Sequence, residues 1–410
     1  MRNFGQIFLY LFLFTLVFYS CDDFDDVSPQ TDDEYFVTKE KLTTYSIIQI
    51  NAIINVASNL YPKLAEISDK FTSGVEVYKL TYKTTFNGKK RLASGLVCLP
   101  TQAGIYPIMS FQNGTNTLHS AAPSVDYNNE LFKVLEITAS TGFVVVIPDY
   151  LGFGEADDMF HPYLHKESTV QTVLDMLKAV EEMMDKQESI ILNNDLYITG
   201  YSQGGWATMA VQEAIDKHYS NEFNLKGSAC GGGPHNLVGF SEFLLSKTDY
   251  PMPYFPAYLY NSYLNLDMAT PIASIFQEPY AGKIPTLFDG TKDGGQLNAQ
   301  LTTSINDLFT PNLIENWDKG GIYESLYSML QENSISGYST STPTLLIHGD
   351  ADTFVPASLS ESLRDEFIDA GVSSELINLT LLPGLGHTDA IVPAELASII
   401  WFIELRDSEI

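Results

Sequence analysis

Two repeating patterns of apolar and polar residues run along most of this chain. Residues 76–83 and 92–99 read as two strands on either side of Asn87-Gly88, which is typical of a hairpin. Strand-like apolar runs then begin near residues 106, 143, 195, 225, 344 and 376, and helical patterns such as 168–185 and 358–370 alternate with them. Strands that alternate with helices predict an α/β fold with a mostly parallel, doubly wound sheet.

The alternation stops between residue 237 and about residue 338. This stretch is rich in Tyr, Phe, Leu and Pro, and it separates two parts of a predicted core, 46–236 and 339–410. Its aromatic side chains either pack a small core of their own or line an apolar cleft, and the sequence supports both interpretations equally. We therefore expect an insert with a distinct role.

The hexapeptide from Gly200 to Gly205 carries the first candidate for chemistry. It places Ser202 in a Gly-x-Ser-x-Gly context, with a strand-like run before it and a helix-forming stretch, 206–215, after it. A serine on such a sharp turn is exposed for nucleophilic attack, and the flanking glycines let the turn pass close to neighbouring strands. The pentapeptide alone also fits a plain glycine-rich turn, but its position between strand and helix favours a nucleophile.

A nucleophilic serine needs a base, and the base needs an acid that fixes its tautomer. His387 follows a late apolar strand and sits in a glycine-rich loop, a combination that the other six histidines lack. Asp350 and Asp352 both follow the strand near 344, so spacing leaves the acid open between them. Loops at the carboxyl ends of parallel strands are where open α/β sheets place their chemistry.

Two further segments resemble known families. Residues 348–356 are similar to the His-Gly-x-x-Asp-x-x-Val-Pro signature of many α/β-hydrolases, and this resemblance assigns the triad acid to Asp352 and leaves Asp350 to brace the turn. The block that contains Pro148, Asp149 and a Gly-x-Gly turn, followed by His161-Pro162-Tyr163, resembles bacterial secretory lipases and carboxylesterases. We expect Asp149 to organise this turn and not to take part in the chemistry.

These resemblances imply the α/β-hydrolase fold, a helical lid or cap at 237–338, and a serine esterase of the lipase or carboxylesterase type. Carboxylic esters, small or borne on a polymer, would be cleaved through an acyl-enzyme on a Ser-His-Asp triad. A prolyl-oligopeptidase-like peptidase shares the elbow and the triad, but the span before residue 75 is too short for its usual propeller. A non-catalytic surface binding protein would have no need of all three triad residues.

Acyl transfer also needs donors aimed at the developing oxyanion. The fold assigns one of them to the backbone N–H of Gln203, the residue after the nucleophile. Resemblance to lipases of the Candida lipase A type points to Asn113 for the other, whereas the commoner His-Gly-x alignment points to Thr115. The choice stays open, and Asn113-Gly114 also fits a simple turn.

The first residues read as a signal for export. Arg2 is followed by an apolar run, 4–19, and then by Cys21, which resembles the acylated cysteine of bacterial lipoproteins. Four aspartates within 22–26 resemble the acidic export signal of Bacteroidota-type surface lipoproteins, or they are only a solvated tether. We expect a signal peptide at 1–20, a disordered acidic tether at 21–45, and a lipid anchor in the outer membrane at the cell surface.

The charge and the cysteine content limit the kinds of binding partner and cofactor that we expect. The formal net charge of −29 argues against nucleic acid and against anionic membrane surfaces, so the membrane contact would come from the lipid alone. Cys98 and Cys230 lie in separate strand-like runs and are expected to be buried free thiols, although an oxidising compartment would permit pairing. No Cys or His cluster has metal-ligand spacing, and we expect neither a metal nor a cofactor. The sequence does not indicate the oligomeric state.

Overall fold

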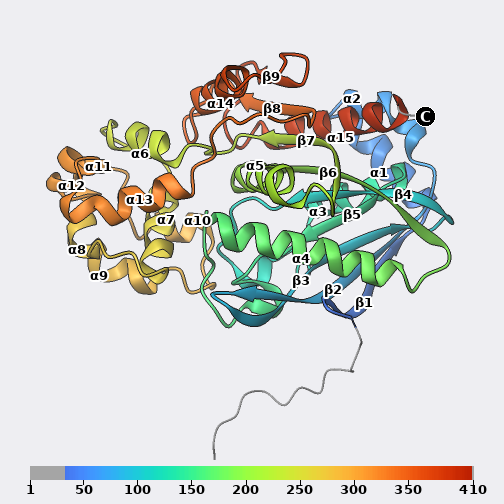
Figure 1. The fold of residues 1–410 in the computed structure, drawn as a ribbon, viewed down its shortest axis with the longest axis horizontal. Helices are drawn as coiled ribbons and strands as arrows, with labels where there is room; N and C mark the ends of the chain where they lie inside the picture. Colours follow the sequence, from blue (N-terminus) through green and yellow to red (C-terminus); the bar gives the residue numbers. More distant parts are fainter. Residues whose placement is uncertain (1–32, 409–410) are drawn as a thin grey trace, which may run out of the picture. The chain divides into compact units, whose positions relative to one another are not determined.

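The computed structural model describes residues 33–408 and contains a nine-stranded sheet with the order β1-β2-β3-β5-β4-β6-β7-β8-β9 (Figure 1). The first three strands pair antiparallel, β3 pairs antiparallel with β5, and all neighbours from β5 to β9 are parallel. The strands are β1 (Phe36–Tyr45), β2 (Val75–Phe86), β3 (Lys89–Pro100), β4 (Gly104–Gln112), β5 (Val144–Pro148), β6 (Ile190–Tyr201), β7 (Asn224–Gly231), β8 (Thr344–Gly349) and β9 (Ile377–Leu382).

Helices cover both faces of the sheet, as the alternating pattern predicts. Along β6, Ile198 packs into the apolar cluster of α4 and α5, while the next residue toward the N-terminus, Tyr197, packs on Phe402 of α15 from the other face. One face carries α1 (Ile47–Ala57), α2 (Lys63–Glu66), α3 (Glu130–Ile137) and α15 (Ile391–Ser408), and the other carries α4 (Lys166–Met184), α5 (Gln203–Ala214) and α14 (Ser358–Asp369). The predicted α/β-hydrolase fold is confirmed.

The insert between β7 and β8 is helical. It contains α6 (Leu237–Leu245), α7 (Tyr254–Asn265), α8 (Ile272–Ile275), α9 (Tyr280–Lys283), α10 (Gly294–Asn298), α11 (Ile305–Leu308), α12 (Pro311–Asn316) and α13 (Glu324–Glu332). Figure 1 shows these helices, coloured from yellow to orange, at the end of the sheet toward which β7 and β8 point. That end is where the loops with the candidate chemistry lie.

The predicted disordered tether is wrong for its last ten residues. Residues 36–45 form β1, an edge strand that pairs antiparallel with β2 and buries Phe36, Val37 and Tyr45. Lys39 and Lys41 on this strand are exposed, and Lys41 pairs with Glu76 of β2 at 2.5 Å. Charged side chains are typical of edge strands, and because of them the sequence of β1 resembles that of a polar tether. The predicted signal peptide, Cys21 and the acidic run 22–26 lie outside the described residues.

Within residues 33–408, no helix combines the length and the apolar character that a membrane span requires.

Candidate active site

Ser202 lies on the sharp turn between β6 and α5. Its backbone has φ 60° and ψ −119°, a conformation that non-glycine residues rarely adopt. A side chain at Gly200 or at Gly204 would collide with the carbonyl oxygen of Gln112, so only glycine permits this close approach to β4. The Ser202 N–H donates to the carbonyl oxygen of Gly231 on β7 at 2.8 Å, which ties the turn to the next strand. The turn has the form of a nucleophile elbow.

His387 connects Ser202 to Asp352. Its Nε2 lies 2.9 Å from the Ser202 Oγ, and its Nδ1 lies 2.6 Å from the Asp352 Oδ2. The imidazole comes from the loop after β9 and the carboxylate from the loop after β8, so neighbouring parallel strands deliver both groups to one edge. The structure therefore brings together the three residues that the sequence selected from distant segments.

The Asp352 carboxylate is held in its ionised form. Its Oδ1 accepts hydrogen bonds from the N–H groups of Phe354 and Val355 at 2.8 and 2.9 Å, which leaves Oδ2 for His387. Burial alone would raise the pKa of Asp352, but hydrogen bonds from His348 and His387 outweigh burial and lower this pKa to about 2. A charged carboxylate at this place keeps the Nδ1–H tautomer of His387.

Asp350 has a different environment. Its Oδ1 accepts a hydrogen bond from the backbone N–H of Gly384 at 2.6 Å, so it braces the loop that leads to His387. The side chain of Asp350 is exposed, whereas Asp352 is buried next to the imidazole. Of the two carboxylates, Asp352 is therefore the one that contacts His387, and Asp350 contacts the loop that precedes it.

His348 is a neighbour of Asp352 that sequence reasoning missed. It is fully buried, and its Nε2 lies 2.9 Å from the carbonyl oxygen of Val355 and 3.3 Å from the Asp352 Oδ2. Its Nδ1 lies 2.8 Å from the Ser360 Oγ on α14, so the serine hydroxyl can donate and leave the proton on Nε2. The residue thus fixes the turn that carries the acid. Its place in the His-Gly-x-x-Asp signature was the only sequence signal for this role.

Gln203 follows the serine and opens α5. Its backbone N–H belongs to the first turn of the helix, where N–H groups have no partner within the helix and the helix dipole favours negative charge. Its side-chain Nε2 lies 2.8 Å from Nε2 of His161, a residue that sequence reasoning set aside as a base. Burial lowers the pKa of His161 to about 4, so a neutral ring donates from Nδ1 to the carbonyl oxygen of Leu151 at 2.7 Å and accepts from Gln203.

The loop after β4 supplies both remaining oxyanion candidates. A side chain at Gly114 would lie only 3.5 Å from the carbonyl oxygen of Tyr201, so this loop passes directly over the elbow. Asn113 is buried, and its carbonyl oxygen accepts a hydrogen bond from Tyr150 at 3.3 Å. The Thr115 Oγ1 lies 2.8 Å from the hydroxyl oxygen of Tyr163. Asn113 therefore lies against the elbow, where a side chain at Gly204 would come within 3.0 Å of its carbonyl oxygen, and Thr115 contacts Tyr163, which lines the cavity beside Ser202.

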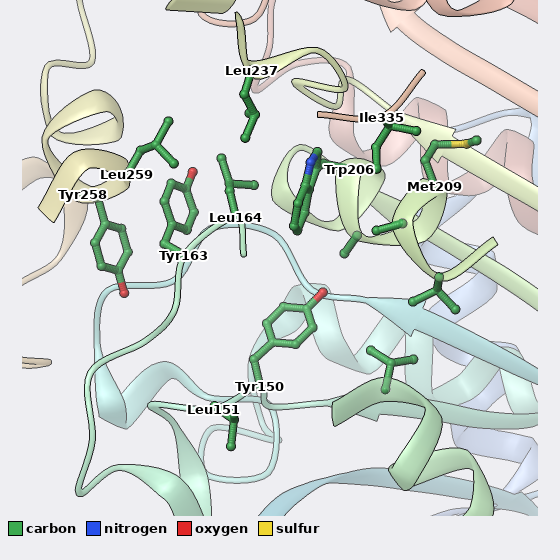
Figure 2. Close-up of a cluster of buried hydrophobic side chains, with 14 of the residues drawn as sticks. Tyr150, Leu151, Tyr163, Leu164, Trp206, Met209, Leu237, Tyr258, Leu259 and Ile335 are labelled. Carbon is green, nitrogen blue, oxygen red and sulfur yellow. The ribbon is translucent and has the colours of Figure 1, made fainter. Parts of the chain in front are cut away.

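The cavity beside Ser202 is small. Its volume is about 10 Å³, the space of roughly one water molecule. Apolar side chains from the core and from the insert line it: Tyr163, Leu164, Pro234, Phe240, Phe255, Leu259 and Val355. Figure 2 shows Tyr163 and Leu164 of the core next to Leu259 of the insert. An acyl chain of several carbons needs more room than this conformation offers.

Asp149 and the two described cysteines take structural positions. The Asp149 carboxylate accepts hydrogen bonds from the Ser94 Oγ at 2.6 Å and from the N–H and Oγ of Ser124 at 2.8 and 2.5 Å, and so it organises the turn after β5. Cys98 and Cys230 are buried free thiols on β3 and β7. Among residues 33–408 no cluster of His, Cys, Asp and Glu could hold a metal ion.

The sequence model of the secretory lipase family matches residues 118–407, which is more than half of the chain and includes the elbow, the insert, Asp352 and His387. The chain belongs to the secretory lipase family. It is accordingly a carboxylic ester hydrolase. The secretory character of the family agrees with export from the cytoplasm, which the N-terminal residues predict. No curated protein sequence matches the chain.

Solved structures share the fold over most of its length. A protein from Legionella pneumophila is 24% identical, with a TM-score of 0.80 over 92% of this chain and 100% of its own. The ligand-bound form of the rice cell wall degrading esterase LipA from Xanthomonas oryzae is 25% identical, with a TM-score of 0.74 over 91% of this chain and 97% of its own. The closed state of Candida antarctica lipase A is 19% identical, with a TM-score of 0.62 over 90% of this chain and 81% of its own.

Proposed function

We propose that this secretory lipase cleaves carboxylic esters through an acyl-enzyme on Ser202. The His387 Nε2 takes the proton from the Ser202 Oγ as the oxygen attacks the ester carbonyl, and the same imidazole then protonates the departing alkoxide. Water, deprotonated by His387, releases the acid in the second half of the reaction. The observation that supports this proposal most strongly is the unbroken series of hydrogen bonds from the Ser202 Oγ through His387 to Asp352.

The oxyanion of each tetrahedral intermediate would be held at the N-terminus of α5. The Gln203 N–H is one donor, since it follows the nucleophile and belongs to the first turn of that helix. The second donor comes from the loop after β4, at Asn113 or Thr115. His161, which binds the side chain of Gln203, would keep that side chain away from the substrate.

The walls of the Ser202 cavity favour an aliphatic acyl group. Phe240, Phe255 and Leu259 come from α6 and α7 of the insert, so the same movement that separates the insert from the core would open the cavity and expose an apolar surface for the acyl chain. This makes the insert a lid.

The protein would work outside the cytoplasm, held by a lipid on Cys21. The described fold begins after residue 32, so 11 residues, 22–32, separate that cysteine from the fold. Esters in polymers or lipids too large to import are the substrates that this location favours, and the X. oryzae relative, a cell wall degrading esterase, acts on such a material.

The test compares Ser202→Ala with a matched serine variant. We expect Ser202→Ala to lower kcat on p-nitrophenyl butyrate by at least about 10³-fold and to abolish labelling by a serine-directed phosphonate, because the covalent step is lost. Ser228→Ala, which alters a buried serine on the neighbouring strand β7, should keep both. An aminoacyl-proline substrate assayed in parallel should not turn over. If Ser202→Ala kept more than about a tenth of the activity, the triad would be wrong.

A further inference from the structure

Tyr163 connects the loop over the elbow to the lid. Its side chain is buried and forms part of the wall of the Ser202 cavity. At one end its hydroxyl oxygen lies 2.8 Å from the Thr115 Oγ1, in the loop after β4. At the other end its ring meets the insert, so a single side chain contacts an oxyanion candidate and the lid together.

The contact with the lid is a stack of three aromatic rings. The rings of Tyr163 and Tyr258 of α7 have centroids 4.6 Å apart and an interplanar angle of 10°. The ring of Phe288, in the insert between α9 and α10, stacks on the other side of Tyr258, at 4.6 Å and 5°. Figure 2 shows the rings of Tyr163 and Tyr258 next to each other, beside Leu164 and Leu259. The stack therefore adds a contact from the insert to the contact that the Tyr163 ring makes with His161 of the core, at 6.0 Å between ring centroids.

The hydroxyl pair has two arrangements, because either oxygen can donate. If Thr115 donates to Tyr163, the threonine proton is occupied and cannot bind an oxyanion. If Tyr163 donates to the Thr115 Oγ1, the threonine O–H is free to point at the substrate. Burial raises the pKa of Tyr163, so the phenol keeps the proton that this second arrangement needs.

We propose that Tyr163 is a positioning residue of the oxyanion hole, which donates to Thr115 so that the threonine hydroxyl becomes the second oxyanion donor, and that the ring stack makes this donor depend on the lid. The inference rests on the proposed triad and deepens it. It also assigns the second donor to Thr115 rather than to Asn113, because the Thr115 hydroxyl contacts Tyr163, a side chain that lines the Ser202 cavity. Lid position would then change kcat, in addition to substrate entry.

The first experiment removes the hydroxyl and keeps the ring. Tyr163→Phe should lower kcat on p-nitrophenyl butyrate about tenfold, with KM within about twofold, because the lost interaction matters only in the transition state. Thr115→Val should lower kcat by about 10²-fold, the effect of losing one oxyanion donor. The double variant should be no slower than Thr115→Val alone, since the tyrosine acts only through the threonine. If the kcat loss in the double variant equalled the product of the losses in the two single variants, the proposal would be overturned.

The second experiment removes the stack and keeps the hydroxyl pair. Tyr258→Leu should lower kcat several-fold in the wild-type background and should not lower it further in the Thr115→Val background. Tyr260→Phe is the matched control, because this buried tyrosine of the same helix α7 bonds to the Ser241 hydroxyl in the lid at 3.2 Å. It should leave kcat unchanged. Circular dichroism and thermal unfolding verify that each variant folds.

Two outcomes separate this inference from the proposed function. If Ser202→Ala is inactive while Tyr163→Phe has wild-type kcat, the triad stands and the role of Tyr163 is refuted. If Tyr150→Phe loses kcat and Tyr163→Phe does not, the second donor belongs to Asn113. A phosphonate should still label Ser202 in Tyr163→Phe, but more slowly, because the nucleophile is intact and only the stabilisation of the oxyanion is reduced.

Discussion

Replacing Glu395 with glutamine tests how a buried carboxyl group under the elbow affects stability. Glu395 lies on α15 and is only 5% exposed, and its charge would act on Tyr201, the residue before the nucleophile. Its one described hydrogen bond comes from the hydroxyl of Thr199 on β6, at 3.4 Å. So long a bond offsets little of the cost of burying an ionised carboxylate. Burial therefore raises the pKa of Glu395 from 4.5 to about 8.

The sign and size of the effect follow from this pKa. A group whose pKa is raised in the folded state binds more protons there than in the unfolded chain, so its contribution to stability is lost as pH rises. The window runs from pH 4.5, the unfolded value, to about 8. The difference of 8 − 4.5 = 3.5 pKa units, at about 1.36 kcal/mol per unit, corresponds to a loss of about 5 kcal/mol in the free energy of unfolding. That is a large part of the ~5–15 kcal/mol that folded domains have.

The assay is urea unfolding of wild type and Glu395→Gln at pH values from 4 to 9. The glutamine keeps the shape and cannot ionise, so the stability difference in favour of the variant should grow by about 1.4 kcal/mol per pH unit within the window. Glu404→Gln is the control, because this glutamate is exposed on the same helix α15. A difference between Glu395→Gln and wild type that stays constant within about 1 kcal/mol from pH 4 to 9 would refute a neutral, buried Glu395.

Two further predictions concern the acid and the anchor. Asp352→Asn should lower kcat by about 10³- to 10⁴-fold by presenting the wrong tautomer of the base, while Asp350→Asn should cost about tenfold or less, because its bond to Gly384 only braces a loop; the opposite ranking in steady-state kinetics would make Asp350 the acid. Cys21→Ala should move the protein from the membrane fraction to a soluble or uncleaved form, and alanines in place of the four aspartates in 22–26 should leave it anchored but hidden from external protease. Wild type found in the cytoplasm with an intact Met1 would contradict the anchor.

The parts of the site that could be predicted are those where the backbone conformation requires particular residues in the local sequence. The elbow needs glycine on both sides of Ser202, and this requirement produces a motif that can be recognised in the sequence. His387 and Asp352 follow apolar strands, and parallel strands bring their carboxyl ends to one edge whatever the distance along the chain. Periodicity also predicted the β2–β3 hairpin around Asn87-Gly88 and the later strands, and burial accounts for the apolar runs of strands such as β5 and β8.

The parts that could not be predicted depend on contacts between distant segments. β1 has a polar, charged sequence because one side of it is an open edge, so composition alone suggested a tether. The role of His161 follows from its contact with Gln203, which lies 42 residues away along the chain. The role of His348 follows from its contact with Asp352, four residues away. His387 differed from both, because a preceding apolar strand and a glycine-rich loop marked it in the sequence.

The insert shows why the sequence left two interpretations of its aromatic residues open. Tyr260, Phe276 and Phe309 pack against one another inside the insert, with ring centroids 5.2 to 6.1 Å apart. Phe255 and Leu259, from the same helix as Tyr260, instead line the cavity beside Ser202. The helix α7 therefore serves a core on one side and the cavity on the other. If the insert acts as the proposed lid, the rings of Tyr260, Phe276 and Phe309 would move with it, because all three residues belong to the insert.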